Sequence, residues 1–245
     1  AVHEGLSRTR FFPEAEQLLF TDADCVLHPA CLRATSALAR DRGLDLLSLL
    51  SDYPAENWYE HVVQPTAGFE LLRQYPLLRA NRTDSRQRPF ANGQFMLFDA
   101  GFYREMGGHE SVRGELLEDL AFAREVKRVG GTSGAFLGGG IVRCRMYETW
   151  DEFKKGWRRI LIEAGQRRSD RIRSSGWRLR MLGAVLPGLT LVLGVVSTAA
   201  CAASDEPVGW CALPAGIAVA GVVAYAIATA KIYGIARVSR LAPFL

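Results

Sequence analysis

The chain has 245 residues, of which 49% are hydrophobic and 23% charged, and its formal net charge is +4. These values fit one folded domain with an appendage, and they exclude a disordered chain, a collagen-like repeat and a small disulfide scaffold. The charge is unevenly distributed, because ten Lys or Arg residues stand between positions 154 and 180 against two acids. Nucleic-acid binding would need basic residues spread over the folded domain, so this pattern favours a basic segment facing a membrane.

The cysteines form no CxxC motif and are odd in number, so they predict neither a zinc site nor a disulfide framework. A reducing compartment is therefore expected, with a pairing of the last two cysteines as the alternative. The five positions are Cys25, Cys31, Cys144, Cys201 and Cys211.

The first predicted element is a buried strand at residues 17–21, an apolar run that leads directly to Asp22 and Asp24. The strand would deliver both carboxylates to its C-terminal edge. Residues 29–42 have helical spacing and residues 44–50 read as a second buried strand. A strand, a helix and a strand in this order predict a parallel α/β sheet.

Residues 58–75 carry apolar side chains at spacings of four and three, which predicts a helix interrupted at Pro65. Packing on the core and a position at a membrane interface both agree with such a stripe. The stripe consists of Trp58, Val62, Pro65, Phe69 and Leu72.

The next predicted elements follow from apolar runs, glycine stops and helical periodicity. They are a mobile polar loop at 81–89, a strand at 94–98, short and longer helices at 100–106 and 117–129, a strand pair within 135–145, and a long amphipathic helix at 149–168.

Two uncharged runs of 24 residues each, 181–204 and 207–230, are long enough to span a bilayer, which takes about 20 apolar residues. Basic residues flank the pair on both outer sides, whereas the connecting loop holds only Asp205 and Glu206. Since Lys and Arg accumulate in cytoplasmic loops, both outer ends are expected on the cytoplasmic side and the loop outside. The prediction is a multi-pass protein of the inner (cytoplasmic) membrane whose catalytic domain is cytoplasmic.

Asp22 and Asp24 are the first candidates for chemistry. Two carboxylates at a strand end can hold Mg²⁺ or Mn²⁺, which prefer oxygen ligands and are often shared with substrate phosphates. A solvated turn is the alternative, because Asp is frequent in turns.

Three further positions have both a structural and a functional interpretation. Glu118 and Asp119 stand in the first turn of a predicted helix. The helix dipole stabilises acidic side chains there, and one of them could also serve as a general base. Gly93 precedes a strand and allows either a bend or close approach of a ligand. Arg158 and Arg159, just before the apolar runs, suit a leaving pyrophosphate or lipid headgroups.

One family interpretation rests on LLFTDADCVL, which satisfies the opening motif of haloacid-dehalogenase-type phosphatases. That interpretation also needs a later Lys and a paired-acid motif on a strand, whereas Glu118 and Asp119 fall on a predicted helix.

The order of the motifs instead resembles a family-2 glycosyltransferase of GT-A fold. TDAD looks like the DxD motif of that family, Gly93 and Gln94 fall at its acceptor-side glycine, and LEDLAFAREVKRVGG resembles its ED helix. The runs WYEHVVQPTAGFELL and ANGQFMLFDAGFYREMGGHESVRGE are similar to membrane glycosyltransferases associated with hopanoid and carotenoid biosynthesis. The resemblance covers about residues 1–168.

This resemblance implies an inverting transfer from a nucleotide-sugar donor to a lipid-like acceptor, such as a terpenoid, a hopanoid or a polyprenyl lipid. Asp24 would hold Mg²⁺ or Mn²⁺ on the donor diphosphate, with Asp22 near the metal or the donor ribose. Asp119 would be the catalytic base and Glu118 its neighbour. Gly93 and Gln94 would lie on the acceptor side.

Two departures from the family pattern matter. KGWRR replaces the QxxRW motif of processive members, which favours a single transfer and leaves Trp157, Arg158 and Arg159 as diphosphate-facing or membrane-proximal residues. The strand that grips the nucleotide base in this family is not found, so the chain is expected to be N-terminally incomplete.

The expected organisation is a GT-A catalytic domain at 1–150, an amphipathic helix and basic neck at 151–180, transmembrane helices at 181–204 and 207–230, and a cytoplasmic tail at 231–245. The alternatives for function are a phosphatase that uses Asp22 and Asp24, or a non-catalytic membrane adaptor that retains the glycosyltransferase fold.

Overall fold

The computed structural model describes residues 5–6, 8–9, 12–53, 55–82, 89–181, 185–203 and 208–235. Most of the loop predicted at 81–89 lies outside these residues. The chain divides into a sheet unit, formed by residues 1–56 and 71–164, and a helical unit, formed by residues 57–70 and 165–245.

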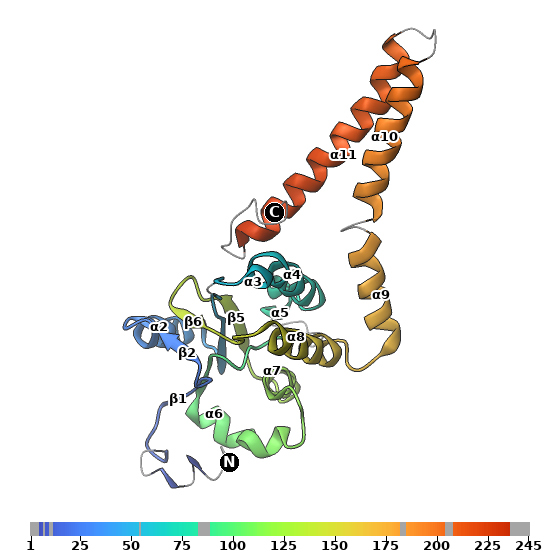
Figure 1. Ribbon diagram of the computed structural model, residues 1–245. Helices are drawn as coiled ribbons and strands as arrows, with labels where there is room; N and C mark the ends of the chain where they lie inside the picture. The colour runs from blue at the N-terminus through green and yellow to red at the C-terminus, as the bar shows by residue number, and fades with distance from the viewer. Residues whose placement is uncertain are drawn as a thin grey trace. The chain divides into compact units, whose positions relative to one another are not determined.

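The sheet unit is built on four strands in the order β1-β4-β3-β5 (Figure 1). They are β1 (Gln17–Phe20), β3 (Leu46–Leu50), β4 (Met96–Asp99) and β5 (Ser133–Leu137). β3 and β5 are parallel, but β4 runs antiparallel to both β1 and β3. The predicted α/β class is confirmed, whereas the prediction of a purely parallel sheet is wrong. The local strand–helix–strand spacing carries no information about β4, which arrives far later in the sequence and enters between β1 and β3.

Helices cover both faces of this sheet, which explains why its central strands are almost uninterruptedly apolar. Leu47, Leu49 and Leu97 face a cluster with Cys31 and Ala39 of α2 (Cys31–Arg42). Neighbouring side chains point to opposite faces of a strand. The alternate residues of these strands therefore contact the other helical layer, α6 (Ala100–Glu105) and α7 (Glu118–Arg128).

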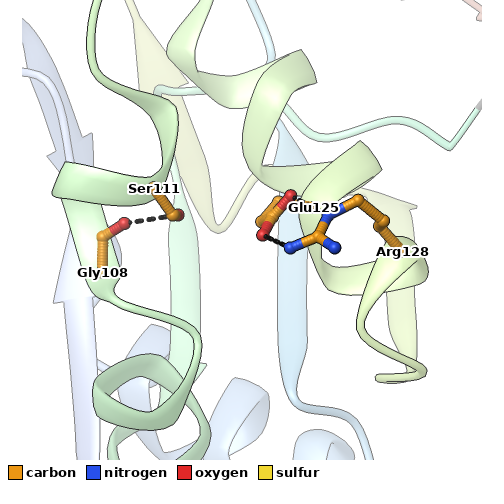
Figure 2. Close-up of polar contacts among 4 residues, drawn as sticks. All are labelled: Gly108, Ser111, Glu125 and Arg128. Atoms are coloured by element: carbon orange, nitrogen blue, oxygen red, sulfur yellow. Dashed lines mark hydrogen bonds and ion pairs between the residues drawn. The ribbon is translucent and has the colours of Figure 1, made fainter.

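An aromatic cluster holds α7 against the sheet. Phe98 of β4 packs edge-on against Phe122 of α7, with ring centroids 5.1 Å apart. On the outer side of α7, Arg128 donates to Glu125 at 2.5 and 2.7 Å (Figure 2). Between α6 and α7, Ser111 of the 3₁₀ helix Gly108–Val112 donates to the carbonyl of Gly108 at 2.7 Å. The helix predicted at 117–129 is thus confirmed, and its first turn has a defined position.

A second, two-stranded sheet pairs β2 (Cys25–Leu27) with β6 (Val142–Cys144) in antiparallel register. Two strands therefore occur in the range predicted at 135–145, but the prediction that they form a pair is wrong, because β5 and β6 pair with different strands. The physical reason is the turn between them, where Gly139 and Gly140 adopt φ values of 62° and 92° and the Gly138 amide donates to Leu50. These contacts turn the chain from the main sheet toward β2.

The remaining helices of the sheet unit are α5 (Leu77–Ala80) and α8 (Trp150–Ala164). α8 ends four residues before the predicted boundary at 168. Gln166 and Arg167 have positive φ values of 57° and 53°, which no residue of a right-handed helix adopts. A separate helix, α9 (Ser169–Arg180), follows in the helical unit.

α3 (Trp58–Val62) ends before α4 (Gln64–Gln74) begins, and the boundary between the two units falls within α4. The predicted interruption at Pro65 is confirmed. Of the two interpretations of the apolar stripe, packing on the core is wrong for Trp58 and Phe69, which are 61% and 41% exposed, and a position at a membrane interface stays a prediction. A break between two helices resets their rotation, so one stripe cannot continue through both.

The helical unit also contains α10 (Leu186–Ala202) and α11 (Val208–Ile235), which pack along each other (Figure 1). Among the described residues, no helix is both long enough and apolar enough to cross a membrane. The transmembrane helices predicted at 181–204 and 207–230 are not found in that part of the chain. Cys201 is disulfide-bonded, so the expectation of unpaired cysteines is wrong at this position.

Candidate active site

The DxD motif leaves the sheet at the end of β1. Thr21 Oγ1 donates to the carbonyl of Gln94 at 2.9 Å, which joins this strand end to the segment before β4. Asp22 and Asp24 follow in a turn in which the Cys25 amide donates to the Asp22 carbonyl at 3.2 Å. Both carboxylates are exposed. The predicted position of the two acids at the strand end is confirmed.

The segment Asn92–Gly93–Gln94 is joined to this strand end through the Thr21 hydrogen bond and is held by Ser48. Ser48, a buried polar residue of β3, accepts from the Asn92 amide at 2.7 Å and donates to its carbonyl at 3.2 Å. This explains the one polar residue in an otherwise apolar strand. The Ser48 bonds hold the backbone on which the Gly93 amide is presented.

Gln94 is only 3% exposed, and its side chain is engaged within the protein. Its Oε1 accepts hydrogen bonds from Ser51, Tyr53 and Asn92, the last two at 3.2 and 2.9 Å. Its Nε2 donates to the sulfur of Cys144 at 3.0 Å. The acceptor-side role of Gln94 stays a prediction, and the contacts present assign it to holding the loop.

Asp119, in the first turn of α7, reaches this loop. Its Oδ2 accepts from the Gly93 amide at 3.0 Å and its Oδ1 from the Leu120 amide at 2.7 Å. Burial raises the pKa of Asp119, and the charge of Asp22 adds to the rise, while the backbone hydrogen bonds oppose it. Glu118, its neighbour, is exposed.

Electrostatics therefore link acids that stand almost 100 positions apart in the chain. Burial raises the pKa of Asp22, and the charge of Asp24 raises it further. Asp22 acts in turn on Asp119. Three carboxylates thus converge where β1 ends and α7 begins. The end of β1 and the start of α7 therefore share a local excess of negative charge.

The KGWRR segment lies on α8. Trp157 is 7% exposed, and its indole nitrogen is buried with no hydrogen-bond partner among the described residues. Arg158 and Arg159 are exposed. Burial raises the pKa of Tyr147, Arg159 opposes this rise and Asp24 adds to it.

Two cysteines beside the DxD motif were not identified from the sequence as site residues. The ligand atoms of Asp24, Cys25 and Cys144 all lie within 4.8 Å of one another. Cys25 directly follows Asp24, which was a usable signal. No local pattern pointed to Cys144, because only the pairing of β6 with β2 brings it to this place.

A mixed α/β sheet with a DxD motif at a strand end and a further carboxylate on a nearby helix fits a GT-A glycosyltransferase domain. The chain matches the family described as "Glycosyl transferase family group 2" over residues 18–228 and belongs to that family. No curated protein matches it. Membership implies a nucleotide-sugar donor and an acceptor, and the phosphatase hypothesis is wrong.

Proposed function

We propose that the protein is a metal-dependent, inverting glycosyltransferase that moves a sugar from a nucleotide sugar to a lipid-like acceptor at the membrane. The observation that carries this proposal is the convergence of Asp22, Asp24 and Asp119, with Asp119 held by the Gly93 amide at 3.0 Å. The resemblance to hopanoid- and carotenoid-associated enzymes suggests a terpenoid, hopanoid or polyprenyl acceptor.

Asp119 is the proposed base. An acceptor hydroxyl attacks the anomeric carbon from the side opposite the nucleotide, and its proton passes to the Asp119 carboxylate. Each carboxylate oxygen accepts one backbone amide and keeps a second lone pair for the incoming proton. The raised pKa of Asp119 suits this role, because a carboxylate of higher pKa accepts the proton of the acceptor hydroxyl more readily. Glu118 adds negative charge beside it.

Asp24 and Asp22 would hold Mg²⁺ or Mn²⁺. When bound, such a cation neutralises the charge that develops on the leaving diphosphate. Arg159 is exposed and would pair with a diphosphate oxygen, with Arg158 and Trp157 as its neighbours in the same segment. Since KGWRR differs from the motif of processive members, we propose a single transfer rather than polymer synthesis.

The membrane setting is supported by the surface of the helical hairpin. Apolar side chains on both helices are at least 41% exposed, which is a larger apolar surface than a soluble monomer usually shows. They are Leu186, Leu189, Leu191, Val192, Leu193, Val195 and Val196 on α10, and Leu213, Ile217, Val219, Val222, Val223 and Ile227 on α11.

The polar groups of the hairpin also suit an apolar surrounding. The hydroxyls of Thr190, Thr198 and Thr229 each donate to a carbonyl of their own helix, at 2.9, 2.7 and 2.9 Å. A hydroxyl bonded in this way needs no water. We propose that the hairpin anchors the protein in the cytoplasmic membrane and leaves the sheet unit in the cytoplasm.

Nucleotide release from candidate nucleotide-sugar donors, in membranes that contain the acceptor lipids, tests the proposed function. Asp24→Ala is expected to abolish release through loss of the metal ligand. Asp41→Asn, an exposed acid on α2, is the control and should keep full activity. Full activity in Asp24→Ala would contradict the metal assignment. A lack of turnover with every donor would instead support the non-catalytic adaptor, and mass spectrometry of lipids after gene deletion would then name the lost product, if any.

A further inference from the structure

The β2–β6 pair places two thiols face to face. Cys25 and Cys144 stand directly opposite each other in the antiparallel register. The amide of His28 donates across the ladder to Ile141 at 2.9 Å, whereas the amide of Cys144 points away from β2 and donates to Asp52 at 3.1 Å. This alternation makes Cys25 and Cys144 a non-hydrogen-bonded pair, the type whose Cα atoms are only about 4.5 Å apart and whose side chains are closest.

Asp24 completes the group. Its Oδ1 lies 3.8 Å from Cys25 Sγ, and its ligand atom, Cys25 Sγ and Cys144 Sγ are all within 4.8 Å of one another. Asp24 is exposed, Cys25 is half-buried and Cys144 is buried. The three donors therefore form a cluster with a closed inner side and an outer side open to an entering ion.

Gln94 supports the inner thiol. Its Oε1 is already occupied by Ser51, Tyr53 and Asn92, so the amide orientation is determined and Nε2 is directed at Cys144 Sγ, 3.0 Å away. Ligand groups in metal sites are commonly held by such outer-shell hydrogen bonds. The sulfur is thus positioned before any ion arrives.

We propose that Asp24, Cys25 and Cys144 bind one thiophilic divalent cation of the Zn²⁺ class. Two thiolates and one carboxylate are a ligand set that Zn²⁺ uses, with its fourth position left to water. On binding, both thiols release their protons to solvent. Thiolates select against Mg²⁺ and Mn²⁺, so this site is chemically distinct from an all-oxygen site at the same Asp24.

Because Asp24 belongs to both sets, Zn²⁺ excludes the hard cation from the donor diphosphate. This consequence rests on the proposed function, whereas the binding of the thiophilic cation does not. The site would make the enzyme sensitive to free Zn²⁺ through two side chains that take no part in glycosyl transfer.

Titration with Cd²⁺ tests the site directly, since thiolate–Cd²⁺ bonds give a charge-transfer absorption in the ultraviolet. The full chain carries Cys201→Ser, so that reduction of the Cys201 disulfide adds no second pair of thiols, and it is reduced and then held without reductant or oxygen. One Cd²⁺ per chain with two thiolates is expected. Cys25→Ser should halve the absorption and weaken binding by at least about tenfold, the lower end of what loss of a supporting group costs a metal site.

Cys31→Ser is the matched control, because this free and buried cysteine lies outside the cluster, and it should leave the titration unchanged. Cys144 is buried, so the half-buried Cys25 carries the test if Cys144→Ser does not fold. An absent absorption, an unchanged titration in Cys25→Ser, or a Cys25–Cys144 disulfide under these conditions would overturn the proposal.

Zn²⁺ inhibition of nucleotide release, relieved in Cys25→Ser, tests the consequence separately. If the wild type releases no nucleotide, the proposed function fails and the Cd²⁺ titration still decides the site.

Discussion

Opposing effects act on the pKa of the Asp119 carboxylate. Two backbone amides stabilise its charged form, but burial and the charge of Asp22 outweigh them and raise its pKa. The native state therefore holds a proton on Asp119 more tightly than the unfolded state does. Between the ordinary pKa of about 3.9 and the raised native value, the native state binds more protons, so its stability falls as pH rises through this window.

Asp119→Asn is accordingly expected to increase the free energy of unfolding at neutral pH, because it removes a buried charge and keeps an oxygen that can accept from the Gly93 amide. The gain should vanish as the pH falls toward the ordinary value of an aspartate. Urea unfolding followed by tryptophan fluorescence at a series of pH values measures it. Asp41→Asn is the exposed control and should show no such gain, and a loss of stability in Asp119→Asn would contradict the expectation.

The same substitution is expected to lower nucleotide release by about 10²–10⁴-fold, the usual contribution of general base catalysis. A variant that is more stable and much less active would separate a chemical role from a folding role. Full activity would mean that the acceptor is already ionised, as a carboxylate is at neutral pH, or that Asp119 is not the base.

At the scale of elements, α8 depends on a glycine. A Cβ at Gly156 would overlap the ring of Tyr147. Gly156→Ala is expected to destabilise the protein by about 1–3 kcal/mol, the usual cost of overpacking. Gly176→Ala on α9 is the matched control, since nothing lies within 4 Å of its added Cβ. There the loss of glycine flexibility should stabilise by about 0.5–1 kcal/mol. Chemical denaturation of both variants compares them, and equal effects would contradict this role of Gly156.

The α10–α11 hairpin depends on small residues in the same way. A Cβ at Gly194 would overlap the side chain of Ala218, and one at Gly221 would lie 3.3 Å from Thr190 Oγ1. Small residues let two helices approach closely, which is how apolar helices associate in lipid.

Gly194→Leu is therefore expected to separate the two helices, whereas Gly188→Leu, on the same helix with nothing within 4 Å, should not. Crosslinking between cysteines introduced on facing positions of α10 and α11 measures their separation in membranes. Loss of crosslinking only in Gly194→Leu is the expected result, and equal crosslinking in both variants would show that Gly194 is dispensable for the contact.

At the scale of the molecule, the distribution of charge predicts a topology. Ten basic residues stand between positions 154 and 180, directly before the first apolar run, and the loop between the runs holds two acids and no base. In intact cells, a membrane-impermeant thiol reagent is expected to label a sole cysteine that replaces Ser204 and not one that replaces Ser174. The reverse pattern would place the sheet unit outside and would remove its access to cytosolic nucleotide sugars.

Local chemistry was sufficient to predict much of this protein. The apolar run at 17–20, the glycine stop at Gly43 and the helical periodicity before Gly130 each act over a few residues, and β1, α2 and α7 form where they indicate. The same local signals placed Asp22 and Asp24 at a strand end. They also indicated a resemblance to the glycosyltransferase family, because the motifs of that family follow one another in a definite order.

Only the tertiary structure decided which strands are neighbours and which side chains meet. Strand pairing depends on contacts between distant segments, so no local pattern predicted that β4 enters between β1 and β3 or that β6 pairs with β2. The proximity of Asp119 to Asp22, the engagement of the Gln94 side chain and the pairing of Cys25 with Cys144 all follow from those pairings. Periodicity likewise could not predict which face of α3 and α4 is buried, because the break between them changes the rotation of one helix relative to the other.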